Sequence, residues 1–365
     1  MNKQKTISGV ASIEKRFSIL RMAVAIGISL ILAFALILTI SDAPFRDMLT
    51  FLIGPLTSVK RLSVVVEKTI PLLFTGTAVC LMTACGQVNL AVEGSFFAGT
   101  FVSTAVAIQQ GIPSGLHFIL CALAGGLAGA LLCWLPGYLN VKFGIMTVVS
   151  SLMINYISLY TGLYIVINIL RDPDVGYEAS RMFAEGSRLP VIIPGTKVHL
   201  GLVIGIAVVA IGAYILYRTK FGYTIRTVGL NADFAKYSGI AVGSTIILTQ
   251  ALGGFFAGLG GTVEILGLYS RFSFAQLTQH GFDGFMIAIV AKNNPRNVPF
   301  AALFLAYIRT AADVLNRTSS IPTEMVKVVQ AVVIMFVAAE KLLSGMEHKA
   351  IVRNTQLQMH QREEE

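Results

Sequence analysis

An acid lies in an otherwise apolar stretch of the chain, where ionisable side chains are rare. Glu93 follows Asn89 by four positions, so the two polar side chains would share one face of a helix. A carboxylate near the middle of a membrane costs about 2.5 to 3.5 kcal/mol. We therefore predict that both side chains face a path for a polar solute. The alternative is that the acid binds backbone N–H groups at the end of a broken helix.

A second acid lies in a short segment that is flanked by glycines. Asp283 follows Phe282 in the segment Gly281–Gly284, and the apolar residues after it end at Lys292. At 1.5 Å per residue this stretch is too short to cross about 30 Å of hydrocarbon. The pattern predicts a half-helix or a re-entrant segment. Because paired interruptions in the two halves of a transporter indicate a central site, we predict that Phe282 and Asp283 also border the path.

Other polar groups in apolar stretches have more than one interpretation. A patch that either lines the path or forms bonds between helices consists of Ser150, Ser151, Asn155 and Tyr156, of which Asn155 is our candidate for the path. Arg309 and Asp313 are four apart and would neutralise each other on one helix. Glu264 follows a glycine-rich stretch, and we expect it near the outer boundary of the membrane.

The elements that hold these residues must be helices in a lipid bilayer. The chain is 55% hydrophobic and 13% charged, with a mean hydropathy of +0.74, whereas an ordinary soluble domain has roughly 25% charged residues. In hydrocarbon only helices or closed barrels satisfy their own backbone groups. The long apolar runs do not alternate as the strands of a barrel do. The sequence therefore predicts an all-α, polytopic transmembrane helical bundle.

The apolar runs predict about ten spans, including broken or half helices. They are Met22–Ile40, Thr69–Ala84, Asn89–Ile108, Leu116–Leu135, Ile145–Ile169, Leu200–Tyr217, Thr245–Leu268, a short Gly284–Ala291, Val298–Asp313 and Met325–Leu343. With the basic N-terminus inside, the positive-inside rule places both termini in the cytoplasm. We predict a cytoplasmic segment 1–21, a permease domain 22–343 with a cytoplasmic loop 218–243, and a cytoplasmic tail 344–365.

Motifs for other kinds of chemistry are missing from the sequence. No HExxH, GxSxG or GxxxxGK[ST] motif is present, so we predict neither an enzyme nor ATP hydrolysis by this chain. The cysteines form no CxxC or Cys/His pair, and we expect packing roles, with no metal or cofactor, for Cys80, Cys85, Cys121 and Cys133. The net charge of +9 fits the positive-inside rule and does not require a nucleic-acid partner.

Glycines recur at spacings of four in two of the predicted spans. Gly125 and Gly129 form one such ladder, and Gly254 and Gly258 form another. Small residues let helix backbones approach closely in a membrane, because no side chain separates them. We predict that both ladders are surfaces where helices pack.

A polar loop, Arg218–Gly243, contains the signals of a short helix. Asn231 is a candidate N-cap, Asp233 lies in the first turn, and Gly239 suits the left-handed position that ends a helix. The pattern predicts a helix of about two turns. Because so short a helix is marginal alone, we expect it to dock on its own bundle or on another protein, or else to lie on lipid.

Several stretches of the chain carry a resemblance to a known family. They are Asn89–Gly94, Ser151–Tyr156, Arg226–Ile240, and Gly258–Gly267 together with Gly281–Gly284. These stretches are similar to segments of ABC importer permeases of the branched-chain amino acid, ribose and nucleoside superfamily, in which Arg226–Ile240 resembles the coupling-helix loop. The likeness covers roughly residues 69–343, and bacterial nucleoside or simple-sugar permeases are the most similar members. One departure is Val290–Asn293, where relatives continue with apolar residues that end in Leu-Gly.

The resemblance implies a permease subunit in a prokaryotic plasma (inner) membrane that imports a nucleoside or a simple sugar. Its partners would be a second permease subunit, identical or paralogous, a cytoplasmic ATP-binding subunit, an extracytoplasmic solute-binding protein and membrane lipid. The residues implied in coupling to the ATPase are Arg226, Gly229, Asn231, Ala232, Asp233, Ala235, Lys236 and Gly239. The main alternative is an ion-coupled secondary transporter, in which Glu93 or Asp283 would bind the coupling ion.

Overall fold

The chain folds into α-helices, several of which can cross a membrane. The structure is a computed structural model that describes residues 27–28, 31–39, 41, 43–319 and 321–338. Within these residues, β-structure is limited to isolated bridges, between Arg171 and Ser180 and between Val191 and His199. The all-α prediction is therefore confirmed for the described chain. The chain forms two compact units, one of residues 55–310 and the other of residues 1–54 together with 311–365.

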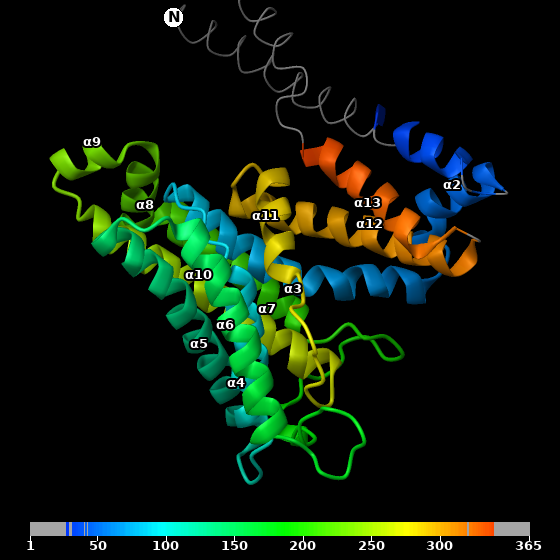
Figure 1. The fold of residues 1–365 in the computed structure, drawn as a ribbon, viewed down its shortest axis with the longest axis horizontal. Coiled ribbons are helices and arrows are strands. Elements are labelled where there is room, and N and C mark those ends of the chain that lie inside the picture. Colours follow the sequence, from blue (N-terminus) through cyan, green and yellow to red (C-terminus); the bar gives the residue numbers. More distant parts are fainter. Residues whose placement is uncertain (1–26, 29–30, 40, 42, 320, 339–365) are drawn as a thin grey trace, which may run out of the picture. The chain divides into compact units, whose positions relative to one another are not determined.

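The larger unit, residues 55–310, contains the helices that carry the candidate site (Figure 1). They are α3 (Val59–Ala84), α4 (Val92–Ala107), α5 (Ser114–Phe143), α6 (Thr147–Asn168), α7 (Gly201–Arg218), α8 (Lys220–Leu230), α9 (Ala232–Tyr237), α10 (Val242–Leu268), α11 (His280–Val290) and the first part of α12 (Val298–Thr318), with the short 3-10 helices η2 (Glu185–Ser187) and η3 (Pro295–Asn297). Helix α10 packs along α5, α4 and α3, which makes it the central helix of this unit.

Six helices in the described part of the chain are long and apolar enough to cross a membrane. They are α3, α5, α6, α7, α10 and α12, the last extended by η3. Helix α11 has only 11 residues, so the predicted short segment is confirmed. Together these helices confirm a polytopic membrane protein. Two predicted spans, Met22–Ile40 and Met325–Leu343, lie partly outside the described residues.

Helix α3 is longer than the sequence predicted, because it begins at Val59 and not at Thr69. The Ser58 hydroxyl accepts a hydrogen bond from the backbone N–H of Arg61 at 3.2 Å and so caps the helix. The polar residues before Thr69, among them Lys68, therefore lie in helical turns and not in a loop. Lys and Arg favour helices but lower hydropathy, so a hydropathy window marks the apolar part of a helix and misses its charged first turns.

Both predicted glycine ladders are confirmed as packing surfaces. A Cβ added at Gly129 would collide with the backbone oxygen of Gly254, and one at Gly258 would collide with the backbone oxygen of Gly125. Gly99 of α4 approaches the backbone of Gly258 in the same way. Helices α4, α5 and α10 therefore touch backbone to backbone, which is the close approach that small residues permit in membranes.

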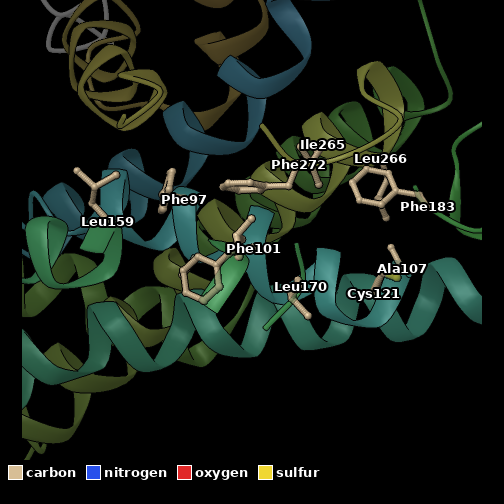
Figure 2. Close-up of a cluster of buried hydrophobic side chains, with 12 residues drawn as sticks. Phe97, Phe101, Ala107, Cys121, Leu159, Leu170, Phe183, Ile265, Leu266 and Phe272 are labelled. Carbon is tan, nitrogen blue, oxygen red and sulfur yellow. The ribbon is translucent and has the colours of Figure 1, made fainter. Parts of the chain in front are cut away.

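A buried hydrophobic cluster fixes the long connection between α6 and α7 to the helices (Figure 2). The Phe97 ring lies 6.0 Å from that of Phe101 and 5.8 Å from that of Phe272, measured between centroids. Phe183, in the connection, belongs to the same cluster, and its backbone N–H donates to the oxygen of Ser270 at 2.9 Å. The connection is therefore a docked part of this unit and not a free loop.

The larger unit has two ends, which we name after the segments found there (Figure 1). The α9 end holds α8 and α9, and the loop end holds the connection of residues 169–200. Gly229 of α8 approaches the backbone of Ala84, so α3 finishes at the α9 end. Helix α11 also finishes there, because the hydroxyl of Thr83 donates to Asn293 at 3.1 Å. The N-terminus of α11 consequently points away from the α9 end.

The smaller unit contains α2 (Pro44–Ile53), the last turns of α12 and α13 (Thr323–Ala338). The hydroxyl of Ser41 donates to the carboxylate of Asp47, in the first turn of α2, at 2.6 Å. A Cβ added at Gly54 would lie 3.0 Å from the Val314 side chain, so the end of α2 packs on α12 within this unit. The predicted cytoplasmic segments 1–21 and 344–365 lie outside the described residues.

Candidate translocation path and coupling segment

Asn89 lies in a turn before α4, which corrects the prediction that it shares a helix face with Glu93. Its side-chain oxygen accepts from the backbone N–H of Ala91 at 2.9 Å, a local bond that asparagine favours over a helix. Its amide nitrogen donates to the backbone oxygen of Cys133 at 3.1 Å and to Gln250 at 2.9 Å. The buried side chain therefore joins the start of α4 to α5 and α10.

Glu93 is fully buried and binds the N-terminus of α11. One carboxylate oxygen accepts from the backbone N–H of Gln279 at 2.6 Å and from the hydroxyl of Thr278 at 3.3 Å. The other accepts from the backbone N–H of Gly281 at 2.6 Å. Gln279 has a left-handed backbone (φ 68°) and gives α11 no side-chain cap of its own. Glu93 supplies the missing cap from a neighbouring helix, and its charge suits a helix N-terminus.

Asn155 of α6 holds the backbone that leads into α4. Its side-chain oxygen accepts from the N–H of Gly94 at 2.8 Å, and its amide donates to the oxygen of Leu90 at 3.0 Å. The hydroxyl of Ser151 accepts from the N–H of Leu90 at 3.1 Å, and that of Ser158 donates to the oxygen of Gly94 at 2.8 Å. For Ser151 and Asn155, bonding between helices is therefore confirmed.

Helix α11 lies in close contact with two other helices through its glycines. A Cβ at Gly281 would collide with the backbone at Glu93 of α4, and one at Gly284 would lie 2.9 Å from the backbone of Thr75 in α3. The two residues between these glycines differ in exposure. Phe282 is half-buried, whereas Asp283 is 2% exposed. Asp283 lies in the first turn of α11, as Glu93 lies in the first turn of α4, and a negative charge is favourable at the start of a helix.

Asp283 forms an ion pair with the guanidinium of Arg309 on α12. This pairing joins two helices, whereas the sequence predicted a pair within one helix between Arg309 and Asp313. The reason is tertiary: α11 brings Asp283 to the side of α12 that carries Arg309, and spacing along one helix does not encode that approach. A buried carboxylate needs such a partner, because an unpaired charge is costly away from water.

His280, which the sequence analysis did not single out, lies among these charges. Its Nε2 atom is 3.9 Å from Glu264, and its Nδ1 atom is 3.9 Å from Asp283. Its ring packs on Phe96 with centroids 5.1 Å apart. Glu264 lies one turn before α10 ends at Leu268. The signal for His280 was its position directly before the segment Gly281–Gly284.

The predicted two-turn helix is confirmed as α9, a helix of six residues. The Asn231 side chain accepts from the N–H of Phe234 at 2.9 Å and caps its start. At its end Gly239 is left-handed (φ 81°), and the N–H of Ile240 donates to the oxygen of Ala235 at 2.9 Å. These bonds form the Schellman arrangement that stops a helix. The sequence did not predict α8, which directly precedes α9.

Helix α8 connects α9 to the ends of two long helices. The guanidinium of Arg226 donates to the backbone oxygen of Leu216 and lies 5.5 Å from the ring centroid of Tyr217, so it holds the end of α7. Gly229 approaches the backbone of Ala84 at the end of α3. Because each contact is to a helix end, a displacement of α8 would act directly on α3 and α7.

Large apolar side chains are exposed at the end of α8 and on α9. The exposed fractions of Leu230, Phe234 and Tyr237 are 88%, 60% and 92%. Of the residues implied in coupling, Ala235 is buried and Arg226 is half-buried, and the exposed ones are Gly229, Asn231, Ala232, Asp233, Lys236 and Gly239. Exposed apolar groups beside polar ones are typical of a surface that binds a partner protein or lies on lipid.

The structure brings the predicted path residues together around the N-termini of α4 and α11, whereas the coupling residues lie at the α9 end. Comparison with known proteins adds a family to this geometry. A family model described as the permease component of the branched-chain amino acid transport system matches residues 62–338.

Three relatives have similar sequence identities to this chain. The glucose ABC transporter permease protein TsgB13 of Haloferax volcanii is 28% identical over 77% of this chain and 77% of its own length. The guanosine ABC transporter permease protein NupP of Bacillus subtilis is 29% identical over 75% of this chain and 80% of its own. The nucleoside ABC transporter permease protein NupB of Lactococcus lactis is 28% identical over 92% of this chain and 95% of its own.

Proposed function

We propose that this chain forms the path by which an ATP-driven importer moves a nucleoside or simple sugar. The chain belongs to the family of permease components of the branched-chain amino acid transport system, which supports this proposal. The chain is a multi-pass ABC transporter permease of the cell membrane and is not itself an enzyme. Its relatives named for guanosine, nucleosides and glucose support the solute class. Among features of the structure, the capped and exposed helix α9 carries the proposal.

The importer needs partners for energy and for solute capture. A cytoplasmic ATP-binding subunit grips α9, and a second permease subunit, a copy or a paralogue, completes the path. An extracytoplasmic solute-binding protein delivers solute at the loop end. This assignment makes the α9 end cytoplasmic and extends to about ten spans with both termini inside. The layout is a segment 1–21, a permease domain 22–343 with its loop 218–243, and a tail 344–365.

The path runs beside the N-termini of α4 and α11. Phe282 and Asp283 border it from α11, and the buried Asn89, Glu93 and Asn155 hold the backbone around it. In this role the three buried side chains act on the solute through the segments that they fix. The bonds from Glu93 to the start of α11 also argue against Glu93 as a site for a coupling ion, because they occupy its oxygens.

The contacts of α8 suggest how ATP hydrolysis drives the path. Closure of the ATP-binding subunits displaces α9, and α8 passes the displacement to the ends of α3 and α7. The turn after α3 leads through Asn89 to Glu93, which holds α11. The two nucleotide states of the partner therefore favour two arrangements of α11, as alternating access requires.

Purification of the tagged chain from its native membrane tests the proposal. We expect an ATP-binding subunit and a solute-binding protein to copurify with the chain, and the ligand held by the latter to be a nucleoside or sugar. A chain that purifies without an ATP-binding subunit, and that still moves solute when reconstituted alone, would contradict the importer assignment. An anionic or strongly apolar ligand in the binding protein would contradict the solute class and leave the ATP-driven mechanism standing.

A further inference from the structure

Four ionisable side chains from three helices form a cluster near the N-terminus of α11. Glu264 of α10, His280 and Asp283 of α11 and Arg309 of α12 make up this cluster, which we call the polar cluster. The His280 nitrogens lie 3.9 Å from each carboxylate, too far for a direct hydrogen bond. Only Asp283 and Arg309 are joined directly.

The polar cluster contains most of the unsatisfied buried polar atoms in the described part of the chain. Six buried side-chain nitrogen or oxygen atoms there lack a hydrogen-bond partner, and four of them belong to this cluster: Glu264 Oε2, His280 Nδ1, Asp283 Oδ2 and Arg309 Nε. Because more than nine in ten buried polar groups of native proteins are satisfied, such a concentration calls for a missing partner. The concentration therefore points to a ligand.

The polar cluster has two buried members and two partly exposed ones. The side chains of Glu264 and Asp283 are 7% and 3% exposed, whereas those of His280 and Arg309 are 21% and 26% exposed. Glu264 lies far along α10 from the end that follows α9, by about 33 Å at 1.5 Å per residue. The polar cluster is therefore distant from the α9 end and nearer the end where solute is expected to enter.

The chemistry of the unsatisfied atoms selects a kind of ligand. The two carboxylate oxygens can only accept hydrogen bonds while ionised, and the Arg309 Nε atom can only donate. A solute with adjacent hydroxyl groups both donates and accepts, and so can satisfy all of them. A phosphate or carboxylate on the solute would instead bring a further negative charge beside Glu264 and Asp283. The next charges, on α3, are Glu67 near Glu264 and Lys68 near His280, so three acids would still face two cations, Arg309 and Lys68, which disfavours anions.

We propose that Glu264, His280, Asp283 and Arg309 bind the solute in transit by hydrogen bonds to adjacent hydroxyl groups, and that they accept neutral ribonucleosides or sugars and reject their phosphorylated forms. This inference rests on the proposed function, because it takes the chain to be a solute path. It adds the residues that contact the solute, and a rule of selection by which neutral solutes pass and phosphorylated ones do not. Glu264 and His280 were not among the path residues that the sequence predicted.

Protection of a thiol from labelling tests the site without relying on transport. His280→Cys is made in the permease–ATPase complex, purified without the binding protein, and its rate of reaction with N-ethylmaleimide is measured. Uridine or glucose at ten times its half-protecting concentration should slow the reaction about tenfold. Uridine 5′-monophosphate and 2′,3′-dideoxyuridine should not. The unsubstituted chain gives the background, because its cysteines are buried.

A matched variant controls for indirect effects on the labelling rate. Ser273→Cys places a thiol on an exposed residue of the α10–α11 connection, outside the polar cluster, and its reaction should be indifferent to solute. Equal reaction of the thiol at position 280 with and without solute would overturn the site. Protection by the monophosphate as strong as by uridine would overturn the rule of selection.

A second variant tests the proposed site if His280→Cys fails to assemble. Glu264→Gln retains size and replaces the carboxylate by an amide, and it should raise the solute concentration for half-maximal uptake by the full complex about tenfold. Glu324→Gln, at an exposed acid of α13, should leave this concentration unchanged. Unchanged uptake by Glu264→Gln would count against the site alone, whereas absence of ATP-driven uptake by the unsubstituted complex would count against the proposed function.

Discussion

At the scale of single residues, buried polar side chains hold broken backbone in place. Glu93 accepts three hydrogen bonds at the start of α11, and Asn155 binds the C=O of Leu90, before α4, and the N–H of Gly94, in its first turn. Backbone at membrane depth that is not helical must find partners in protein, because lipid offers none. These residues therefore make a short, interrupted helix such as α11 possible.

Replacement of Glu93 should affect folding before it affects transport. Glu93→Gln turns one acceptor oxygen into a donor that faces the N–H of Gln279 or Gly281, so at least one buried N–H loses its partner. We expect a loss of about 2 kcal/mol or more in stability and a lower yield of assembled complex. Thermal unfolding of the purified permease in detergent measures this, with Glu324→Gln as the control. A variant that is as stable as the unsubstituted chain and yet inactive would instead favour direct contact between Glu93 and the solute.

His199 should make the loop end sensitive to acid. It lies outside the spans, and burial lowers the pKa of its imidazole to about 4 from an ordinary 6.5. Because the folded state resists protonation, stability is full above about pH 6.5 and falls as the pH drops toward 4. We expect a lower unfolding temperature at pH 5 than at pH 7.5, and a smaller difference in His199→Asn. Identical pH dependence of the two proteins would refute the role of His199.

The sequence identified the two acids of the broken segments but not all of their partners. Glu93 and Asp283 were conspicuous because acids are rare in apolar stretches. Spacing within one helix suggested Asp313 as a partner of Arg309 and gave no signal for Asp283, which the fold brings to it. His280 was passed over because a lone histidine carries little signal until its neighbours in space are known.

At the scale of elements, glycines set how closely the helices approach. Gly129 of α5 faces the backbone of α10, whereas a Cβ at Gly115, near the start of the same helix, would meet nothing within 4 Å. Gly129→Ala should therefore destabilise the permease by about 1 to 3 kcal/mol. Gly115→Ala should leave stability unchanged or slightly higher, because alanine favours a helix. Unfolding temperatures in detergent distinguish the two, and equal effects would mean that α5 and α10 do not touch there.

Helix α9 was predictable because its signals are local. Asn231 and Gly239 cap it through bonds to residues a few positions away, and no distant contact is needed to recognise them. The start of α3 was not predictable from hydropathy, because its first turns are charged. Contacts between elements, such as Glu93 with α11, depend on the fold and lie beyond what spacing along one helix can indicate.

Replacement of α9 by a flexible linker should uncouple the importer. A glycine–serine segment in place of Asn231–Gly239 removes both caps and the exposed side chains of Phe234 and Tyr237. Helix α8 then no longer continues into a rigid helix that the ATP-binding subunit can grip. We expect ATP hydrolysis to lose its stimulation by solute-loaded binding protein, and uptake to fall to background. The double variant Phe234→Ser and Tyr237→Ser, which keeps the caps, should show a partial loss. Normal uptake in the linker variant would remove α9 from the mechanism.

At the scale of the whole molecule, the α9 end and the polar cluster lie far apart and are joined by α3, α10 and α11. In the proposed mechanism, an energy source at the α9 end therefore controls solute at the polar cluster without direct contact between them. The family match over residues 62–338 shows that the chain is an ABC permease. The proposed mechanism and its alternative differ in their energy source. It is ATP hydrolysis by a partner in the first, and an ion bound by Glu93 or Asp283 in an ion-coupled transporter.

Uptake by the reconstituted complex tests this mechanism most directly. Proteoliposomes that contain the permease and its ATPase, with solute-binding protein outside and ATP inside, are supplied with labelled nucleoside or sugar. We expect uptake that requires ATP and persists when ionophores collapse every ion gradient. Uptake that continues without ATP or the ATPase, and that stops when an ion gradient is removed, would contradict the ATP-driven mechanism.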